Sequence, residues 1–379
     1  MKFRSRLVVN LDNLAYNVNQ IRKITPNTNI LFMIKADGYG HGMIPIARYA
    51  ITELGIREFG CATIGEALKL REELNELEFD IYVFSDIQLE LLENVDIYLK
   101  RRIIPVISNV SELDYILHTP ELRNFPICLK FNTGMNRLGL DPNDAPLIVN
   151  RLKQHGRTSV HHLISHYANA SAGMDANQTN VLQRTRFEEI KKFFRDAGIT
   201  LERTSQSNSG SIEQKTGLRE NSGDTHARPG LMLYGPSSLN DGVPGSFQGK
   251  LVSKLETYIL RVFEVQKGDV VGYNSTPCPE DGLIAILAIG YGDGFFNRYS
   301  GAHLYHKGFE GTIIGRVSMD MTHVFFPKEA IGKITAHEIF TIWGQTEDDL
   351  KKFCMETKTI PYEVFCALLP RVPRVYRLN

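Results

Sequence analysis

Alternation of short apolar runs with segments of helical periodicity constrains the fold of this chain more than any other feature. Eight runs rich in β-branched and aromatic residues occupy positions 30–35, 59–64, 80–85, 103–108, 126–131, 161–167, 201–207 and 226–235. Helical patterns cover positions 11–24, 65–76, 110–117, 142–154 and 177–197, the last followed by Gly198 as a helix-terminating glycine. Strands and helices that alternate at this spacing indicate parallel strands joined by crossover helices.

Eight such units predict a closed, eight-stranded parallel (β/α) barrel of the TIM type. An open doubly wound sheet is the alternative, because the number of strands does not by itself show closure. The stretch 236–249 is rich in Gly, Pro and Ser, and strand-like runs without helices follow it at 252–265, 282–292, 311–326 and 337–344. We therefore predict a barrel domain at 1–236 and a β-rich C-terminal domain at 237–379.

The composition argues against several classes of partner. With 43 Lys and Arg against 43 Asp and Glu, the formal net charge is zero, which does not suit a nucleic-acid-binding surface. The 5 cysteines are scattered and form no C-x-x-C pair, as expected for a chain without a disulfide framework. The longest apolar run, 283–289, is too short to span a bilayer, and no signal-peptide pattern opens the sequence. We expect a cytoplasmic protein with no membrane partner.

Lys35 ends the first apolar run, within the segment IKADGYGHG. In a parallel barrel this position lies at the carboxyl rim of the strands, where active sites are built. A lysine held in a pocket there can form a Schiff base with an aldehyde, and a lysine that snorkels to solvent is the alternative. The glycines that follow, Gly38, Gly40 and Gly42, suit either a tight turn or the close approach of a phosphate.

Three histidines lie in one predicted strand, HHLISHY at 161–167. Histidine clusters of this kind are one signature of a zinc site. His161 and His162 are adjacent, however, and adjacent residues of a strand point to opposite faces. We therefore expect no metal ion.

The segment KADGYGHG strongly resembles the pyridoxal-phosphate attachment site of alanine racemases. The similarity continues through LKFNTGMNRLGL (129–140), HARPGLMLYG (226–235), GYNS (272–275), GRVSMD (315–320) and LPRVPRVYR (369–377). This resemblance implies a barrel followed by a β domain, pyridoxal 5'-phosphate as cofactor, and interconversion of L- and D-alanine to supply D-alanine for peptidoglycan. It also implies a homodimer in which the second domain of one subunit completes the barrel site of the other.

The resemblance implies a role for each matching residue. Lys35 would carry the cofactor as a Schiff base and, once the substrate amine displaces it, act as the base on one face of the substrate. Tyr273 would act on the opposite face, and Arg228 would lie against the pyridine nitrogen. Further cofactor contacts are implied for Tyr39, His166, Ser209, Gly230, Leu231 and Tyr362. The substrate carboxylate would bind Arg137 and the backbone amide of Met319, and Lys130 matches a lysine that is often carbamylated in relatives.

Several positions depart from the usual family pattern. Asn132 stands where aspartate is usual, and Asn136 where glycine is usual. Ser205 replaces a histidine at the start of a His-Ala-Ala-Asn-Ser type run, which places in question any hydrogen-bond relay that supports the pyridine-side arginine. Asn274 and Ser275, after the expected catalytic tyrosine, differ from the small residues common in alanine-specific members.

These departures leave alternative activities open. Modest changes in a pocket discriminate weakly between side chains, so a racemase of broad specificity, acting on serine or basic amino acids, is one alternative. A decarboxylase of the same fold is another, against which Arg228 argues because such enzymes favour an acidic residue there. A simple carrier of pyridoxal phosphate would not need Tyr273 or Met319.

Overall fold

The computed structural model describes residues 3–89, 92–215, 223–346 and 348–378 of the chain. The chain divides into two compact units. One comprises Leu14–Gly38 and Met43–Gly249, and the other comprises Met1–Asn13, Tyr39–Gly42 and Lys250–Asn379. The second unit thus includes the first strand of the chain and a four-residue segment next to the predicted Schiff-base lysine.

A ring of parallel strands builds the first unit. Its hydrogen-bonded path runs through β11 (Thr204–Ser205), β9 (His162–Ile164), β7 (Cys128–Lys130), β6 (Ile103–Ile107), β5 (Asp80–Asp86), β4 (Glu58–Thr63) and β3 (Phe32–Met33). β2 (Asn29–Ile30) lies one residue before β3 and pairs in parallel with β12 (His226–Ala227). The amide of Thr225 donates to the carbonyl of Thr204, and this bond links β12 to β11. The ring is therefore closed, and the predicted eight parallel strand positions are confirmed.

Short strands and turns complete the barrel. β8 (Ser159–Val160) and β10 (Thr200–Leu201) pair in parallel just before β9 and β11. The predicted strand at 226–235 is only partly correct, because residues 231–234 form a 3₁₀ turn. Pro229 has no amide to donate to a neighbouring strand, and its carbonyl oxygen accepts from the amide of Met33 at 3.3 Å before the chain enters this turn.

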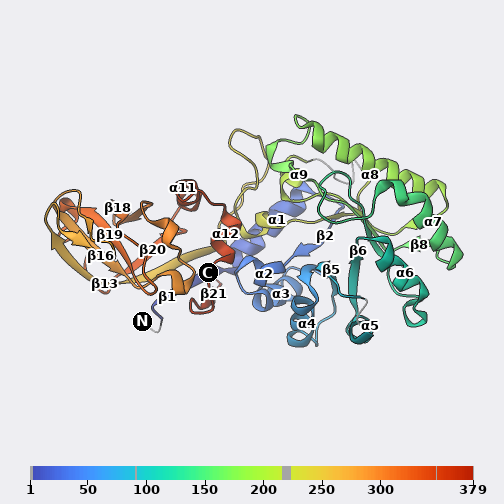
Figure 1. Cartoon of the computed structure of the whole chain (residues 1–379), viewed down its shortest axis with the longest axis horizontal. Coiled ribbons are helices and arrows are strands. Elements are labelled where there is room, and N and C mark those ends of the chain that lie inside the picture. The colour runs from blue at the N-terminus through green and yellow to red at the C-terminus, as the bar shows by residue number, and fades with distance from the viewer. Residues whose placement is uncertain (1–2, 90–91, 216–222, 347, 379) are drawn as a thin grey trace. The chain divides into compact units, whose positions relative to one another are not determined.

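Helices alternate with the barrel strands (Figure 1). They are α1 (Leu11–Ile24), α3 (Met43–Thr52), α4 (Ile64–Glu73), α5 (Leu92–Arg101), α6 (Val110–His118), α7 (Ala145–Gln154), α8 (Gln178–Asp196) and α9 (Ser209–Glu213). Each helix predicted from the sequence begins and ends within three residues of its predicted bounds. α4 and α6 begin with capping boxes in which Thr63 pairs with Glu66 and Asn109 with Glu112. Among the described residues, none of the helices is long and apolar enough to cross a bilayer.

The second unit is a mainly antiparallel sheet. The hydrogen-bonded order is β17 (His303–His306), β18 (Phe309–Ile313), β19 (Thr322–Pro327), β16 (Gly282–Leu287), β13 (Ser253–Val265), β1 (Ser5–Asn10) and β21 (Arg374–Arg377), with β20 (Ile339–Trp343) also paired to β13. The predicted β-rich domain is confirmed. In the described part of this unit, two short helices, α11 (Asp349–Glu356) and α12 (Pro361–Cys366), follow β20, beyond the last predicted strand-like run at 337–344.

A left-handed turn, α2 (Lys35–Tyr39), follows β3. Ala36, Asp37 and Tyr39 all have φ near +53°, and Gly38 and Gly40 have φ of 65° and 77°. The carboxylate of Asp37 accepts from the amide of Met43 at 3.1 Å and helps to hold the turn. Because a left-handed conformation costs a residue with a Cβ about 1–2 kcal/mol, a run of such residues indicates a backbone that the surrounding structure must hold in place.

Replacement of Gly40 by alanine should destabilise the protein strongly. A Cβ at this position would lie 2.1 Å from the carbonyl oxygen of Phe365, in addition to the cost of the positive φ. We expect a loss of about 3 kcal/mol or more in the free energy of unfolding, measured by urea denaturation. Gly55→Ala is the matched control, because Gly55 has φ +64° and no atom within 4 Å of an added Cβ. Equal losses in the two variants would contradict this prediction.

Candidate active site

Basic side chains gather where the barrel strands end. Lys35 lies two residues after β3, Lys130 is the last residue of β7, His166 lies two residues beyond β9, and Arg228 directly follows β12. The carboxyl ends of parallel barrel strands share one rim. The structure therefore brings these four predicted residues to the same end of the barrel.

The charges of these residues act on one another. Burial lowers the pKa of Lys130 to about 8, and the positive charges of Arg137, Arg228 and Lys35 contribute in that order. The pKa of His166 falls well below its usual value, first because of burial and then because of the same cationic side chains. His166 is therefore neutral at physiological pH. The rim as a whole is a concentrated positive field that suits an anionic ligand.

Arg228 is buried, and hydrogen bonds from its guanidinium group reach the ends of two neighbouring strands. Nη1 donates to the carbonyl oxygen of Ser205 at 2.7 Å and also to its hydroxyl. Nη2 donates to the carbonyl oxygen of Ser165 and, at 3.4 Å, to Nδ1 of His166. Burial lowers the pKa of Arg228 to about 10, so the group stays charged at neutral pH.

Ser209 and Gly230 form a second group of polar donors in the same unit. Ser209 is the first residue of α9, and its hydroxyl accepts from the amide of Gly230 at 2.9 Å. Asn208 caps α9, since its side chain accepts from the amide of Ser211. Leu231, the next predicted contact, is buried at the start of the 3₁₀ turn. A hydroxyl and adjacent backbone amides are the donors that a phosphate dianion requires.

Arg137 lies exposed on the loop that follows β7. The side-chain oxygen of Asn132 accepts from the amides of Gly134 and Asn136, at 3.2 and 2.9 Å, and so shapes the loop. The Nδ2 of Asn132 donates to the side-chain oxygen of Asn136 at 3.0 Å, a bond that an aspartate could not donate. Asn136 has φ 54°, which asparagine tolerates better than most residues other than glycine. The two departures from the family pattern thus compensate for one another.

Tyr39 and Tyr362 lie together in the β-rich unit. Their ring centroids are 5.9 Å apart. Burial, followed by the neighbouring Tyr362 and Cys366, raises the pKa of Tyr39. The Tyr39 hydroxyl is therefore protonated and able to donate a hydrogen bond.

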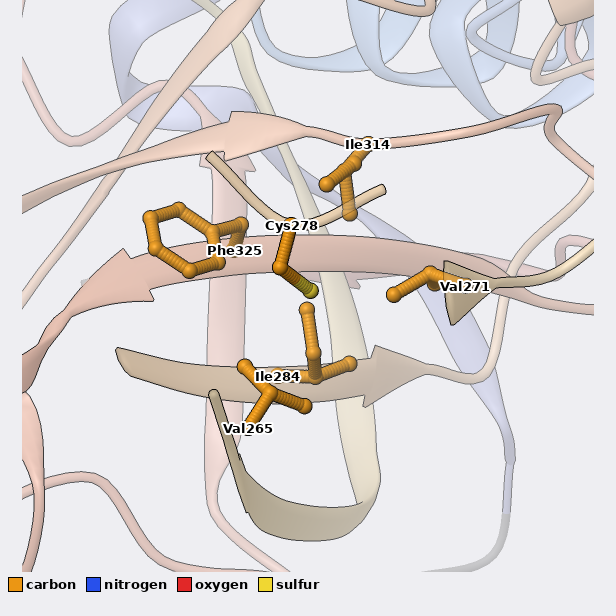
Figure 2. Close-up of a cluster of buried hydrophobic side chains, with 6 residues drawn as sticks. All are labelled: Val265, Val271, Cys278, Ile284, Ile314 and Phe325. Carbon is orange, nitrogen blue, oxygen red and sulfur yellow. The ribbon is translucent and has the colours of Figure 1, made fainter. Parts of the chain in front are cut away.

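Tyr273 lies at the tip of a short hairpin formed by β14 (Val270–Val271) and β15 (Thr276–Pro277). Figure 2 shows the hydrophobic cluster that anchors this hairpin. The cluster contains Val265, Val271, Cys278, Ile284, Ile314 and Phe325. Asn274, with φ 69°, accepts through its side-chain oxygen from Nε and Nη2 of Arg316, at 3.1 and 2.9 Å. The hairpin is held at its base and beside its tip, yet the Tyr273 side chain is 70 % exposed.

Met319 lies on the connection between β18 and β19, and its side chain is 52 % exposed. Its backbone is tightly held, because its carbonyl oxygen accepts from the amide of Gly292 at 2.9 Å. A Cβ at Gly290 would also lie 2.2 Å from the carbonyl oxygen of Ser318. Tyr273 and Met319 therefore both combine a fixed backbone with a solvent-facing side chain.

The side chains of His161 and His162 contact different partners, as expected for adjacent residues of a strand, which point to opposite faces. Nδ1 of His161 lies 3.0 Å from the carboxylate of Glu202, whereas Nε2 of His162 lies 2.9 Å from the hydroxyl of Ser205. Within the described ranges, no three His, Cys, Asp or Glu side chains come together as metal ligands.

The structure contains a buried polar network behind Arg228 that the sequence pattern does not predict. Lys191 is fully buried, and its Nζ lies 2.7 Å from Glu188 of the same helix and 3.0 Å from Asp224, whose other carboxylate oxygen accepts from the amide of Gln206. One signal was available, because Lys191 falls on the same face of α8 as the buried Phe187 and Phe194. A lysine on an apolar helix face requires a buried partner, but nothing in the helix pattern identifies Asp224 as that partner.

The closed barrel with a basic rim, joined to an antiparallel β domain, defines a two-domain α/β-barrel enzyme. Residues 9–238 match the family model of the alanine racemase N-terminal domain, and residues 252–376 match that of the C-terminal domain. The chain belongs to the alanine racemase family.

Individual relatives support this assignment over nearly the whole chain. An alanine racemase of Hahella chejuensis is 30 % identical and aligns over 98 % of this chain and 97 % of its own length. The alanine racemase structure from a D-cycloserine-producing Streptomyces lavendulae superposes with a TM-score of 0.85 at 25 % identity, over 100 % of this chain and 98 % of that one. An alanine racemase structure from Bartonella henselae, with covalently bound pyridoxal phosphate, gives a TM-score of 0.84 at 25 % identity, over 99 % of each chain.

Lys130→Met should stabilise the protein at neutral pH, and this gain should shrink as the pH rises. Between the folded pKa of about 8 and the ordinary value of 10.5, the unfolded state of the wild type binds more protons, so its stability increases with pH. The corresponding ceiling on the gain is about 3 kcal/mol. Unfolding free energies of both proteins should be measured in carbon-dioxide-free buffer from about pH 7 to about pH 11. A difference that stays constant over this range would contradict the prediction.

Proposed function

We propose that this protein is a pyridoxal-phosphate-dependent alanine racemase that interconverts L- and D-alanine and supplies D-alanine for peptidoglycan. The observation that carries this proposal is that Lys35 and a buried, charged Arg228 both lie at strand ends on the same rim of the barrel. The two domains of the chain also both match the family. The related structure from Bartonella henselae, which holds pyridoxal phosphate covalently, supports the same cofactor here.

The chemistry of the site residues fits this cofactor. The hydroxyl of Ser209 and the amides of Gly230 and Leu231 would hold the phosphate, together with the hydroxyls of Tyr39 and Tyr362. Arg228 would face the pyridine nitrogen, and the neutral ring of His166 would lie beside the cofactor ring. The bound cofactor supplies the electron sink that makes removal of the Cα proton possible.

Two side chains would move the Cα proton. Nζ of Lys35 takes the proton from one face of the substrate while the hydroxyl of Tyr273 returns a proton to the opposite face, and the roles reverse for the other enantiomer. Arg228 carries only donors and stays charged, so it does not hold a proton on the pyridine nitrogen. This limits the negative charge drawn into the ring and so disfavours side reactions such as transamination.

Substrate binding would involve the loop after β7. The exposed guanidinium group of Arg137 suits bidentate binding of the substrate carboxylate, and the backbone amide of Met319 would be a second donor. With a pKa of about 8, a substantial fraction of Lys130 is the neutral amine that reacts with carbon dioxide. The products are a carbamate anion and a proton. The carbamate would attract Arg137 instead of repelling it.

The purified protein with added pyridoxal phosphate should convert L-alanine to an equal mixture of both enantiomers, measured by chiral chromatography. Lys35→Ala should lower this activity by at least about a thousandfold, because it removes both the covalent attachment and one proton-transfer group. Lys153→Ala, on the exposed face of α7, is the control and should keep wild-type activity. Faster racemisation of serine or basic amino acids, or release of carbon dioxide from any amino acid, would contradict the proposed specificity.

We further propose a cytoplasmic homodimer with shared active sites. Residues 1–236 would carry the cofactor-binding barrel, and residues 237–379 would contribute Tyr273 and Met319 to the site of the partner. The large exposed fractions of these two side chains, on rigidly held backbone, support this proposal. None of the 5 cysteines, all of which lie in the described ranges, forms a disulfide within this chain, in agreement with a reducing compartment.

Mixing two inactive variants should restore activity if the sites are shared. In a Lys35→Ala and Tyr273→Phe heterodimer, one site carries both substitutions and the other carries neither. Random exchange of subunits should therefore recover up to about a quarter of wild-type activity. Unmixed variants taken through the same mild dissociation are the control. Failure to recover activity, with subunit exchange verified by mass spectrometry, would show that each site belongs to one subunit.

A further inference from the structure

We propose that His162 is a positioning residue for Arg228 and acts through the hydroxyl of Ser205. This inference rests on the proposed function, in which Arg228 faces the pyridine nitrogen of the cofactor. Position 205 carries serine where relatives carry histidine, and the imidazole that supports Arg228 comes instead from His162 on the neighbouring strand.

The three side chains form a continuous buried chain of hydrogen bonds. β9 and β11 are adjacent and parallel, and their register pairs Ser205 with Ile164. Nε2 of His162 lies 2.9 Å from the Ser205 hydroxyl oxygen, which in turn accepts from Nη1 of Arg228. His162 and Ser205 are fully buried and Arg228 is almost so. Solvent therefore does not compete for these bonds.

The direction of the hydrogen bonds follows from the donors available. Arg228 can only donate, so the Ser205 oxygen accepts from it. Among the described residues, the other side-chain partner of that hydroxyl is His162, and in the proposed relay the hydroxyl proton is directed at Nε2. The proposed relay therefore requires the neutral tautomer of His162 that is protonated on Nδ1. Burial first, then the charges of neighbouring groups including Arg228, lowers the pKa of His162 well below its usual value.

Neighbouring rings fix the orientation of the imidazole. The ring centroid of His226 lies 5.1 Å from that of His162, and the ring of Tyr82 makes an edge-to-face contact at 5.6 Å. His226 is itself held by the carboxylate of Glu58 at 3.1 Å and the hydroxyl of Thr225 at 2.7 Å. Nδ1 of His162 has no hydrogen-bond partner in the described part of the chain, so the bond between Nε2 and Ser205 is the only hydrogen bond of the imidazole there.

The relay strengthens the hold on the guanidinium group. A hydroxyl that donates its own proton becomes a better acceptor, because hydrogen bonds in a chain polarise one another. The Ser205 oxygen therefore holds Nη1 more firmly with His162 present than it would alone. The effect of His162 is to keep the plane of the Arg228 guanidinium group in a fixed orientation toward the position that the pyridine nitrogen would occupy.

A double-mutant cycle on the holoenzyme tests this relay. His162→Phe and Ser205→Ala should each weaken pyridoxal-phosphate binding, shift the visible absorption of the bound cofactor, and lower kcat for alanine by about tenfold. The double variant should be no worse than Ser205→Ala alone, because His162 acts only through that hydroxyl. Additive losses would show that His162 serves packing alone and would overturn the proposal.

Two further variants keep the test decisive if phenylalanine disturbs the fold. His162→Gln retains an acceptor for the Ser205 hydroxyl and should restore most of the affinity and the absorption spectrum. His118→Phe alters an exposed histidine of α6 whose ring bonds to the carbonyl oxygen of Asp114 and not to Ser205, and should match the wild type. Failure of rescue by glutamine, together with a wild-type melting temperature for that variant, would overturn the relay.

Nitrogen NMR of the holoenzyme, with histidine labelled by ¹⁵N, gives a readout independent of activity. The His162 signals should show the neutral form with the proton on Nδ1, and a proton on Nε2 would overturn the proposal. A wild-type protein that bound no pyridoxal phosphate and racemised no amino acid would refute the proposed function instead. The tautomer observed in the same sample would still decide the His162–Ser205 bond.

Discussion

Burial of the Arg228 guanidinium group is the interaction on which the rest of the site depends. A buried cation is costly unless hydrogen bonds replace the water it loses. Here the replacement comes from the carbonyl oxygens of Ser165 and Ser205 and from the Ser205 hydroxyl, all at the carboxyl ends of neighbouring strands. Closure of the barrel through β12 and β2 is what brings Arg228 to these acceptors. Closure of the barrel therefore also determines whether the charge of Arg228 can be buried at this site.

The balanced net charge of the chain conceals a strongly uneven distribution. Forty-three basic and forty-three acidic residues cancel over the sequence, yet Lys35, Arg137 and Arg228 all act on Lys130 at one rim of the barrel. Each cation lowers the pKa of Lys130, so the rim without a ligand is electrostatically strained. An anionic ligand, or a negative charge on Lys130 itself, would relieve that repulsion.

Departures from the family pattern become intelligible when their contacts are known. Asn132 and Asn136 bond to one another through groups that the usual aspartate and glycine do not offer. Ser205, which lacks the usual imidazole, contacts His162 of the next strand. In both cases the departure removes a group that the family usually has at that position. A second residue in contact with it then makes a hydrogen bond with the residue present here.

The sequence by itself determined the barrel, the β-rich domain, the bounds of five helices and the family, because hydrophobic periodicity and local motifs are properties of neighbouring residues. It also identified the strand-end lysine, whereas the left-handed conformation of the turn that follows it came from the structure. Tertiary structure alone decided that β1 joins the second sheet, that a 3₁₀ turn at Leu231–Tyr234 follows the last barrel strand, and that His162 meets Ser205. These features depend on the register between strands distant in sequence, and no local pattern encodes that register.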